Sequence, residues 1–307
     1  MDPIAPPGRR VPVILNASAG RGWTRESIAE LGERFARHRL DADVRVAATG
    51  ADVSRIAREL MREASPLLVA AGGDGTVSCV ASHVQGTETV LGVLPLGTLN
   101  HFARDLGLAT DLDDAIAAIA ANRTARVDVG EVNGLHFINN ASLGLYPDIV
   151  RDRTRQQRRL GRGKYRAMAW ATLAALRRSS FLHLTVELDG KSSQAGRAPF
   201  VFIGNNEYVM EGFRIGERSS LGKGRLSVYT TRRRSRFGLV ALAMRALFGR
   251  LQQADDFLAE SVTRLRVESR HRYLHVATDG EVTRMQTPLE FRSLPAALRV
   301  VGPAQDR

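Results

Sequence analysis

The sequence has a single cysteine, Cys79, so no disulfide can form within the chain. One cysteine among 307 residues is typical of a protein from a reducing compartment. The seven histidines show no spacing typical of a zinc site, and we expect no structural zinc. The fold must therefore be stabilised by apolar cores, and a chain of this length is long enough to form two of them.

The sequence also lacks a long apolar run. The most apolar stretches, residues 167–176 and 237–249, are shorter than the roughly 18 residues that a membrane-spanning helix needs. The first ten residues contain prolines and arginines but no apolar segment, so we do not expect a signal peptide. We expect a cytoplasmic protein that is either soluble or bound to a membrane surface.

Basic residues outnumber acidic ones, and the formal net charge is +12. Much of it lies in two basic segments, Arg151–Arg166 and Arg232–Arg236. Such an excess favours polyanionic partners. Because few aromatic residues interrupt these segments and no nucleic-acid-binding motif is present, we expect no nucleic-acid partner. The polyanionic partners still expected are an anionic membrane surface and phosphorylated substrates.

The first part of the chain alternates strand and helix patterns. Strands are predicted at 11–15, 44–47, 67–71 and 90–94, and helices at 25–38, 51–63, 77–84, 99–105 and 112–121. This alternation predicts a parallel sheet covered by helices on both faces. We assign it to a first domain over residues 1–122.

After residue 122 the pattern becomes rich in strands. They are predicted at 126–132, 135–139, 183–188, 200–203, 225–230, 261–267, 273–277 and 289–292, with helices only at 165–176 and 237–251. Asn133-Gly134 and Asp189-Gly190 are typical of hairpin turns. We therefore predict a β-rich second domain over residues 123–295.

The most informative segment runs from Leu67 to Ser78, where an apolar strand leads into three glycines, an acid and a hydroxyl. Glycines between a strand and a helix let backbone N–H groups approach a phosphate closely. Asp74 would repel a bare phosphate, so its presence indicates a cation such as Mg²⁺ beside a nucleotide triphosphate.

Two further loops, Asn16–Gly20 and Pro95–Asn100, follow predicted strands, and Thr49-Gly50 is a weaker third. Since parallel strands bring their carboxyl ends to one edge of a sheet, these loops are expected to converge on a phosphate or nucleotide site. The sequence contains neither the lysine motif of P-loop proteins nor a complete G-x-G-x-x-G.

Together these motifs resemble the diacylglycerol kinase family, the soluble bacterial lipid kinases related to sphingosine and ceramide kinases. The resemblance rests on Asn16–Gly20, Gly72–Thr76, Pro95–Arg104, Val127–Gly130, Asn139–Gly144 and Asp279–Glu281. It implies a three-layer nucleotide domain, Rossmann-like and similar to that of NAD kinases, and a β-sandwich-like second domain. It also implies that residues 296–307 complete the first domain.

The resemblance implies an ATP-dependent enzyme that phosphorylates a hydroxyl of a diacylglycerol-like or sphingoid lipid. Glu281 corresponds to the general base, with Asp279 beside it. Asp74 and Asp128 correspond to positions associated with Mg²⁺, and Asp74 also counts among the catalytic residues. The implied ATP site consists of Asn16, Ser18, Gly20, Thr49, Gly72, Gly73, Asp74, Gly75, Thr76, Ser78, Gly97, Thr98 and Asn100.

The sequence departs from the family pattern in three places. Ser78-Cys79 replaces a usual Asn-Glu, and His101 replaces a frequent Asp. Lys223 stands where many relatives have an aspartate that helps to hold a second, structural cation. We therefore expect that second cation site to be absent, and hypothesise that the Lys223 ammonium takes the cation's place.

Other interpretations stay open. By spacing alone, Asp279-Gly280 is a hairpin turn, and Asp128 could pair with an arginine such as Arg126. An NAD kinase-like phosphotransferase and a non-catalytic nucleotide- or lipid-binding regulator are the alternative functions. The expected partners are ATP, a lipid acceptor and the anionic inner face of the membrane, reached through Arg151–Arg166 and Arg232–Arg236; a homodimer is left open.

Overall fold

The computed structural model describes residues 10–20, 22–144, 147, 182–193, 197–209, 218, 220–231 and 257–302. They form two compact units. The first runs to Val129 and resumes at Pro295, and the second is Gly130–Leu294. Both boundaries fall within long strands, β5 (Thr124–Val132) and β17 (Leu289–Val301). The two basic segments and the helices predicted at 165–176 and 237–251 lie outside the described residues.

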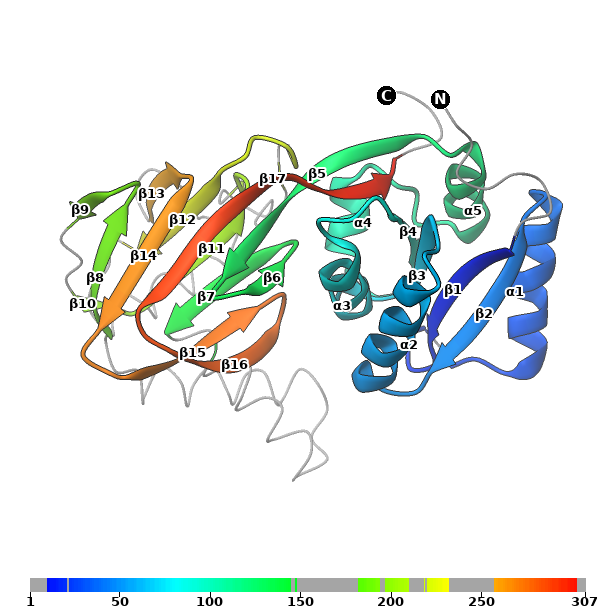
Figure 1. Cartoon of the computed structure of the whole chain (residues 1–307), viewed down its shortest axis with the longest axis horizontal. Coiled ribbons are helices and arrows are strands. Elements are labelled where there is room, and N and C mark those ends of the chain that lie inside the picture. The colour runs from blue at the N-terminus through cyan, green and yellow to red at the C-terminus, as the bar shows by residue number, and fades with distance from the viewer. Residues whose placement is uncertain are drawn as a thin grey trace, which may run out of the picture. The chain divides into compact units, whose positions relative to one another are not determined.

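The first unit contains a parallel sheet with the strand order β17-β4-β3-β1-β2. Its other strands are β1 (Arg10–Asn16), β2 (Asp41–Ala47), β3 (Leu67–Gly72) and β4 (Val90–Pro95). The helices are α1 (Arg25–Arg37), α2 (Gly50–Arg62), α3 (Asp74–Val84), α4 (His101–Asp105) and α5 (Leu112–Ala121). α2 packs on α3 and α1 contacts α5, so helices cover both faces (Figure 1).

The local sequence accounts for these elements. Every residue of β3 and β4 is buried, as expected of central strands covered on both faces. Thr24 and Thr49 each start a helix with a reciprocal capping box, which satisfies backbone N–H groups that would otherwise lack a partner. The predicted three-layer α/β fold is confirmed. No helix in the described part of the chain is long and apolar enough to cross a bilayer.

The second unit is a sandwich of two sheets. The strand order is β13-β12-β11-β7-β15-β16 in one and β10-β8-β14-β17 in the other, where β9 pairs with β8 and β5 with β17 and β6. The bounds are β6 (Leu135–Phe137), β7 (Asn140–Gly144), β8 (Leu182–Leu188), β9 (Lys191–Ser193), β10 (Arg197–Ala198), β11 (Phe200–Asn205), β12 (Leu226–Thr231), β13 (Phe257–Val262), β14 (Arg264–Ser269), β15 (Tyr273–Thr278) and β16 (Glu281–Gln286).

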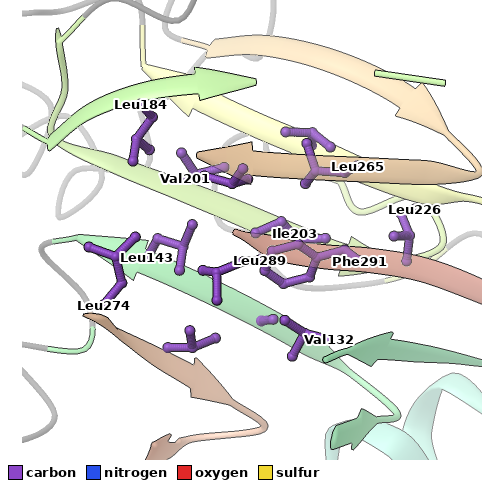
Figure 2. Packing of buried hydrophobic residues seen from close by; sticks show 14 of the residues in the cluster. Val132, Leu143, Leu184, Val201, Ile203, Leu226, Leu265, Leu274, Leu289 and Phe291 are labelled. Carbon is purple, nitrogen blue, oxygen red and sulfur yellow. The ribbon is translucent and has the colours of Figure 1, made fainter. Parts of the chain in front are cut away.

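One apolar core fills the space between these two sheets. Val201 and Ile203 of β11 face Leu265 of β14 and Phe291 of β17, and all four side chains are buried (Figure 2). Alternate residues of each strand enter the core, as the two-residue period of a strand requires. This arrangement confirms the β-sandwich-like fold predicted for the second half.

Some strand predictions were wrong in detail. The single strand predicted at 261–267 is two strands in different sheets, β13 and β14, separated by Thr263. One carboxylate oxygen of Asp189 causes the break, because it accepts the N–H groups of Thr263 (2.9 Å) and Arg264 (2.8 Å). β7 and β16 were not predicted at all.

Candidate functional site

The loops predicted to converge follow β1, β3 and β4, which are adjacent in the sheet. Side-chain and backbone contacts join all three loops. Asn16, the last residue of β1, donates its Nδ2–H to Thr76 Oγ1 at 2.9 Å, and Thr76 lies in the first turn of α3. The Asn16 Oδ1 accepts the N–H of Ser18 at 2.9 Å. Both ends of the Asn16 amide are thus used to position loop residues.

Gly72 is required for this contact. A Cβ atom added at Gly72 would lie 2.5 Å from Thr76 Oγ1, the atom that Asn16 contacts. Any larger residue would displace the Thr76 hydroxyl. The glycine in this position therefore has a packing role within the protein, in addition to the phosphate-binding role that the sequence predicted.

The loops after β3 and β4 meet at two glycines. A Cβ atom added at Gly97 would lie 2.6 Å from the Gly73 Cα and 2.7 Å from Asn100 Oδ1. Asn100 is buried, adopts a left-handed conformation (φ 50°) and ties the loop to itself. Its Oδ1 accepts the Gly97 N–H (2.9 Å) and its Nδ2 donates to Pro95 O (3.2 Å) and Gly97 O (2.9 Å).

Gly97→Ala should therefore destabilise the first unit. The added methyl group meets backbone, which cannot rotate away, so we expect a cost of about 1–3 kcal/mol and a lower Tm. Gly32→Ala in α1 is the matched control, because its Cβ would meet nothing within 4 Å and alanine favours a helix. Thermal unfolding of both variants checks the prediction, which an unchanged Tm for Gly97→Ala would contradict.

The N-terminus of α3 lies where the loops after β1, β3 and β4 meet, an edge of the sheet that we call the rim. Gly73 is its N-cap and makes no side-chain capping hydrogen bond. A Cβ atom added at the exposed Gly75 would have nothing within 4 Å, so the space next to this first turn is open. Free N–H groups and the positive end of the helix dipole favour an anion there.

Asp74 is the acid of this loop. It is half-buried, and its Oδ1 accepts the N–H of Phe102 in α4 at 3.3 Å. One oxygen of the carboxylate thus helps to fix α4 beside α3. The other has no recorded partner among the described residues, which leaves it available to a cation.

The other predicted residues of the ATP site lie on these loops, on α3 or at the start of α2. Ser18, Gly20 and Thr98 are exposed, and Ser78 is half-buried on α3. Thr49 caps α2, and its hydroxyl donates to Asp52 at 2.8 Å, a bond that lowers the pKa of Asp52.

Asp128 lies on β5 and is 2% exposed. Its Oδ1 accepts the N–H of Ala296 in β17 at 2.9 Å. The alternative partner considered from the sequence, Arg126, instead bonds the carboxylate of Glu88 at 3.1 and 3.3 Å. Across the described residues, no group of three or more His, Cys, Asp or Glu side chains is arranged to hold a metal ion.

Asp279 and Glu281 belong to the second unit. Asp279-Gly280 forms the two-residue turn between β15 and β16, with positive φ at both residues (47° and 88°). The hairpin-turn interpretation is therefore correct at the level of the backbone. Glu281 is the first residue of β16, lies opposite Thr278 and is exposed.

The Asp279 carboxylate is used within the fold. Its Oδ2 accepts the N–H of Ile138 (2.9 Å), and its Oδ1 accepts those of Asn139 (2.9 Å) and Asn140 (3.0 Å). Hydrogen bonds from three consecutive amides to one carboxylate are strong and fix the turn in place. Glu281 is two residues along the chain, so this contact also limits where Glu281 can lie.

Sequence reasoning missed Arg218. Its Nη1 donates to Ile138 O (2.6 Å) and its Nη2 to Asn139 Oδ1 (2.9 Å). Residues 138–140 donate their N–H groups to Asp279, and Arg218 holds the same segment through Ile138 O and Asn139 Oδ1. The only sequence signal was that Asn139 and Asn140 belong to the family motifs, because an isolated arginine has no spacing to interpret.

Lys223 lies beside a carboxylate. Its Nζ is 2.6 Å from Glu207 Oε2, and its N–H donates to Asn206 Oδ1 at 3.0 Å. The ammonium thus forms an exposed ion pair with Glu207, and the hypothesis that it takes the place of a cation stays a prediction. The expected absence of the second cation site from this chain also stays a prediction.

Comparison with known proteins adds to this geometry. Residues 10–132 match the diacylglycerol kinase catalytic domain, and residues 143–302 match the YegS C-terminal NAD kinase beta sandwich-like domain. A diacylglycerol kinase of Bacillus subtilis is 27% identical over 302 residues, 97% of each chain. One of Staphylococcus epidermidis is 34% identical over 149 residues, 44% of each chain.

The fold is also found in solved structures. A diacylglycerol kinase from Bacillus anthracis superposes with a TM-score of 0.69 at 19% identity, over 95% of this chain and 96% of the other. A second structure from that organism gives a TM-score of 0.73 at 22% identity, over 95% and 97% of the two chains. At these identities the likeness concerns the fold alone.

Proposed function

The chain belongs to the diacylglycerol kinase family of ATP-dependent lipid kinases, and we propose that its acceptor is the free hydroxyl of diacylglycerol or of a chemically similar lipid such as a sphingoid base. The family carries the acceptor class, and the observation that carries the kinase part of the proposal is the joined rim of the first unit. Asn16 bonds Thr76, Gly73 packs on Gly97, and the open first turn of α3 lies between these contacts. This rim suits the phosphates of ATP.

We propose that Mg²⁺ accompanies the nucleotide, held by Asp74 with Asp128 in support. Mg²⁺ is usually bound by one or two carboxylates together with phosphate oxygens and water, which needs no larger protein cluster. The fit is supported by Asp74, which has one carboxylate oxygen without a recorded partner among the described residues. When bound, Mg²⁺ would neutralise charge on the phosphates.

Transfer of the γ-phosphoryl group requires that the acceptor hydroxyl be positioned and that its proton be accepted. The acceptor hydroxyl attacks the γ-phosphorus, its O–P bond forms, and the bond from that phosphorus to the β–γ bridging oxygen breaks to release ADP. We assign Glu281 to accept the hydroxyl proton. We assign Asp279 to position Glu281, because its own carboxylate already accepts three N–H groups.

We propose that the protein works at the cytoplasmic face of the membrane, since its acceptor lies in a bilayer. Arg151–Arg166 and Arg232–Arg236 are the segments that the sequence assigns to this surface. A homodimer remains a prediction.

The test is a labelling experiment. The protein is incubated with labelled ATP, Mg²⁺ and either a total lipid extract or NAD, and the labelled product is identified. Label in a phosphorylated diacylglycerol or sphingoid supports the proposal and names the lipid. Label in NADP would establish the NAD kinase-like alternative, and no label with either acceptor would favour the non-catalytic regulator, against which the presence of Asp74 and Glu281 argues.

A further inference from the structure

β15 and β16 form the edge hairpin of the six-stranded sheet (Figure 1). The hairpin carries a basic surface with an exposed tyrosine. We define the hairpin patch by the residues Arg270, His271, Arg272, Tyr273, His275 and Arg284. All of them are exposed, and Tyr273, at 39%, is one of few large hydrophobic side chains exposed to this extent in the described residues. We propose that the hairpin patch docks the protein on an anionic lipid surface.

The register places three of these side chains on one face. Tyr273 lies opposite Gln286, and His275 lies opposite Arg284. Opposite residues of an antiparallel pair project to the same side, so Tyr273, His275 and Arg284 share a face. The intervening Leu274 and Val276 point the other way, into the sandwich core. The hairpin is thus buried on one side and basic on the other.

The three arginines of the hairpin patch are not paired with acids within the described part of the chain. Arg270, Arg272 and Arg284 have no recorded ion pair there, whereas the nearby Glu268 is paired with Arg266 at 3.1 Å. An uncompensated group of arginines at a sheet edge attracts anions. It also discourages pairing of the edge strand with another chain.

The turn that presents the patch is held firmly. Thr287 donates its N–H to Arg272 O at 3.0 Å and its hydroxyl to His271 O at 2.9 Å. Ser269 Oγ accepts the N–H of His271 at 3.2 Å. A preorganised turn loses little conformational freedom when it binds, so more of the interaction energy appears as affinity.

Tyr273 favours a membrane over a nucleic acid. The guanidinium carbon of Arg284 is 4.1 Å from its ring centroid, and that of Arg272 is 5.6 Å away. A ring covered by guanidinium groups offers a poor stacking platform for a base. A tyrosine flanked by arginines is instead typical of the membrane–water interface, where the ring lies among headgroups and the arginines contact phosphates.

This inference rests on the proposed function for its biological sense, because a lipid kinase must reach an acceptor within a bilayer. The patch shares its hairpin with Glu281, the proposed base, which follows the turn at the opposite end of β15. By the same register Glu281, opposite Thr278, lies on the other face of the hairpin with Leu274 and Val276, so docking through the patch would anchor the hairpin without covering the Glu281 side. It would act in addition to the two basic segments assigned from the sequence.

The test compares Arg272→Gln/Arg284→Gln with the wild-type chain in vesicle co-sedimentation. Vesicles contain phosphatidylcholine with or without phosphatidylglycerol, and no ATP is added. Each basic residue near an anionic surface contributes about a factor of five, so we expect binding to anionic vesicles to weaken by roughly tenfold to thirtyfold. Binding should also weaken with salt.

The matched control is Arg39→Gln/Arg62→Gln, which removes two exposed arginines from the first unit. This control has the same net charge as the hairpin variant, and it should bind anionic vesicles nearly as well as the wild type does. Equal binding of the wild type and the hairpin variant would overturn the proposal. An equal loss of vesicle affinity in both double variants would also overturn it. So would a hairpin variant that binds an RNA oligonucleotide more weakly but binds vesicles as the wild type does.

Kinase assays separate docking from catalysis. With short-chain diacylglycerol dispersed in a neutral detergent, Arg272→Gln/Arg284→Gln should keep the wild-type kcat, while its activity on vesicle-embedded diacylglycerol falls. Loss of activity in both assays would assign these arginines to catalysis and overturn the proposal. If the wild type binds anionic vesicles as expected but phosphorylates no lipid, the proposed function fails and the docking surface stands.

Discussion

Glu281→Gln should lower kcat by roughly 10²- to 10⁴-fold, the range that a positioned general base typically contributes. Glutamine has nearly the shape of glutamate but cannot accept the proton that leaves the acceptor hydroxyl. Glu281 is exposed at the start of β16, and its backbone continues to pair with Thr278. The variant should therefore fold normally and bind ATP with unchanged affinity.

The measurement combines steady-state kinetics on dispersed diacylglycerol, nucleotide titration and thermal unfolding. Glu290→Gln is the control, because Glu290 is an exposed glutamate of the same unit whose contact with Arg266 at 3.2 Å lies on the surface. It should change kcat little because Glu290 has no part in the proposed site, and change the Tm little because exposed ion pairs contribute little to stability. A kcat for Glu281→Gln close to that of Glu290→Gln would refute the general-base assignment.

Asp279→Asn should affect stability as well as activity, unlike Glu281→Gln. Its carboxylate accepts three backbone N–H groups, and asparagine would direct an NH₂ group at one or more of these donors. Asp279→Asn should therefore lower the Tm together with kcat, because leaving such donors without an acceptor costs about 1–3 kcal/mol. Glu281→Gln should lower kcat alone. The two variants together distinguish a residue that accepts the proton from one that positions it.

The sequence predicted the first unit well because its signals are local. β3 and β4 are continuous apolar runs, and the helices start at capping residues such as Thr24 and Thr49. Such signals need only a few neighbouring residues to be interpreted. Three starts shifted by two or three residues: α3 begins at Asp74 and β2 at Asp41, earlier than predicted, and α4 begins later, after the left-handed Asn100 that ends the preceding loop.

The second unit was harder to predict because its determinants are distant in sequence. The break at Thr263 is caused by Asp189, 74 residues earlier, and the Ile138–Asn140 segment is bound by Asp279, about 140 residues later. β16 is an edge strand with only partly buried residues, so it lacks the alternation that identifies strands. The hairpin patch was missed because Arg284 joins Tyr273 only through the pairing of β15 with β16.

The same limit applies to the candidate site. Motifs indicated which loops gather at the rim, but not that Asn16 would bond Thr76 or that Gly73 would pack on Gly97. Those contacts explain why two of the glycines are needed even without a bound nucleotide. A glycine-rich loop is thus shaped by its protein neighbours as well as by its ligand.

Asp74→Asn should lower kcat by roughly 10²- to 10³-fold, the typical loss when one charge-stabilising group is removed from a transferring site. Asparagine retains an oxygen that can accept the Phe102 N–H, so the contact between α3 and α4 should persist and the Tm should change little. What is lost is the negative charge proposed to hold Mg²⁺. The Mg²⁺ concentration needed for half-maximal activity should therefore rise.

Asp114→Asn is the matched control, since Asp114 is an exposed acid in the first turn of α5 and has no part in the proposed site. It should leave both kcat and the Mg²⁺ requirement close to those of the wild type. The Mg²⁺ dependence is the decisive measurement, because a residue that only fixed α4 could affect kcat but would not change the demand for the cation. An unchanged Mg²⁺ requirement in Asp74→Asn would limit Asp74 to holding Phe102, and the charge that attracts the cation would then have to come from elsewhere, with Asp128 as the next residue to replace.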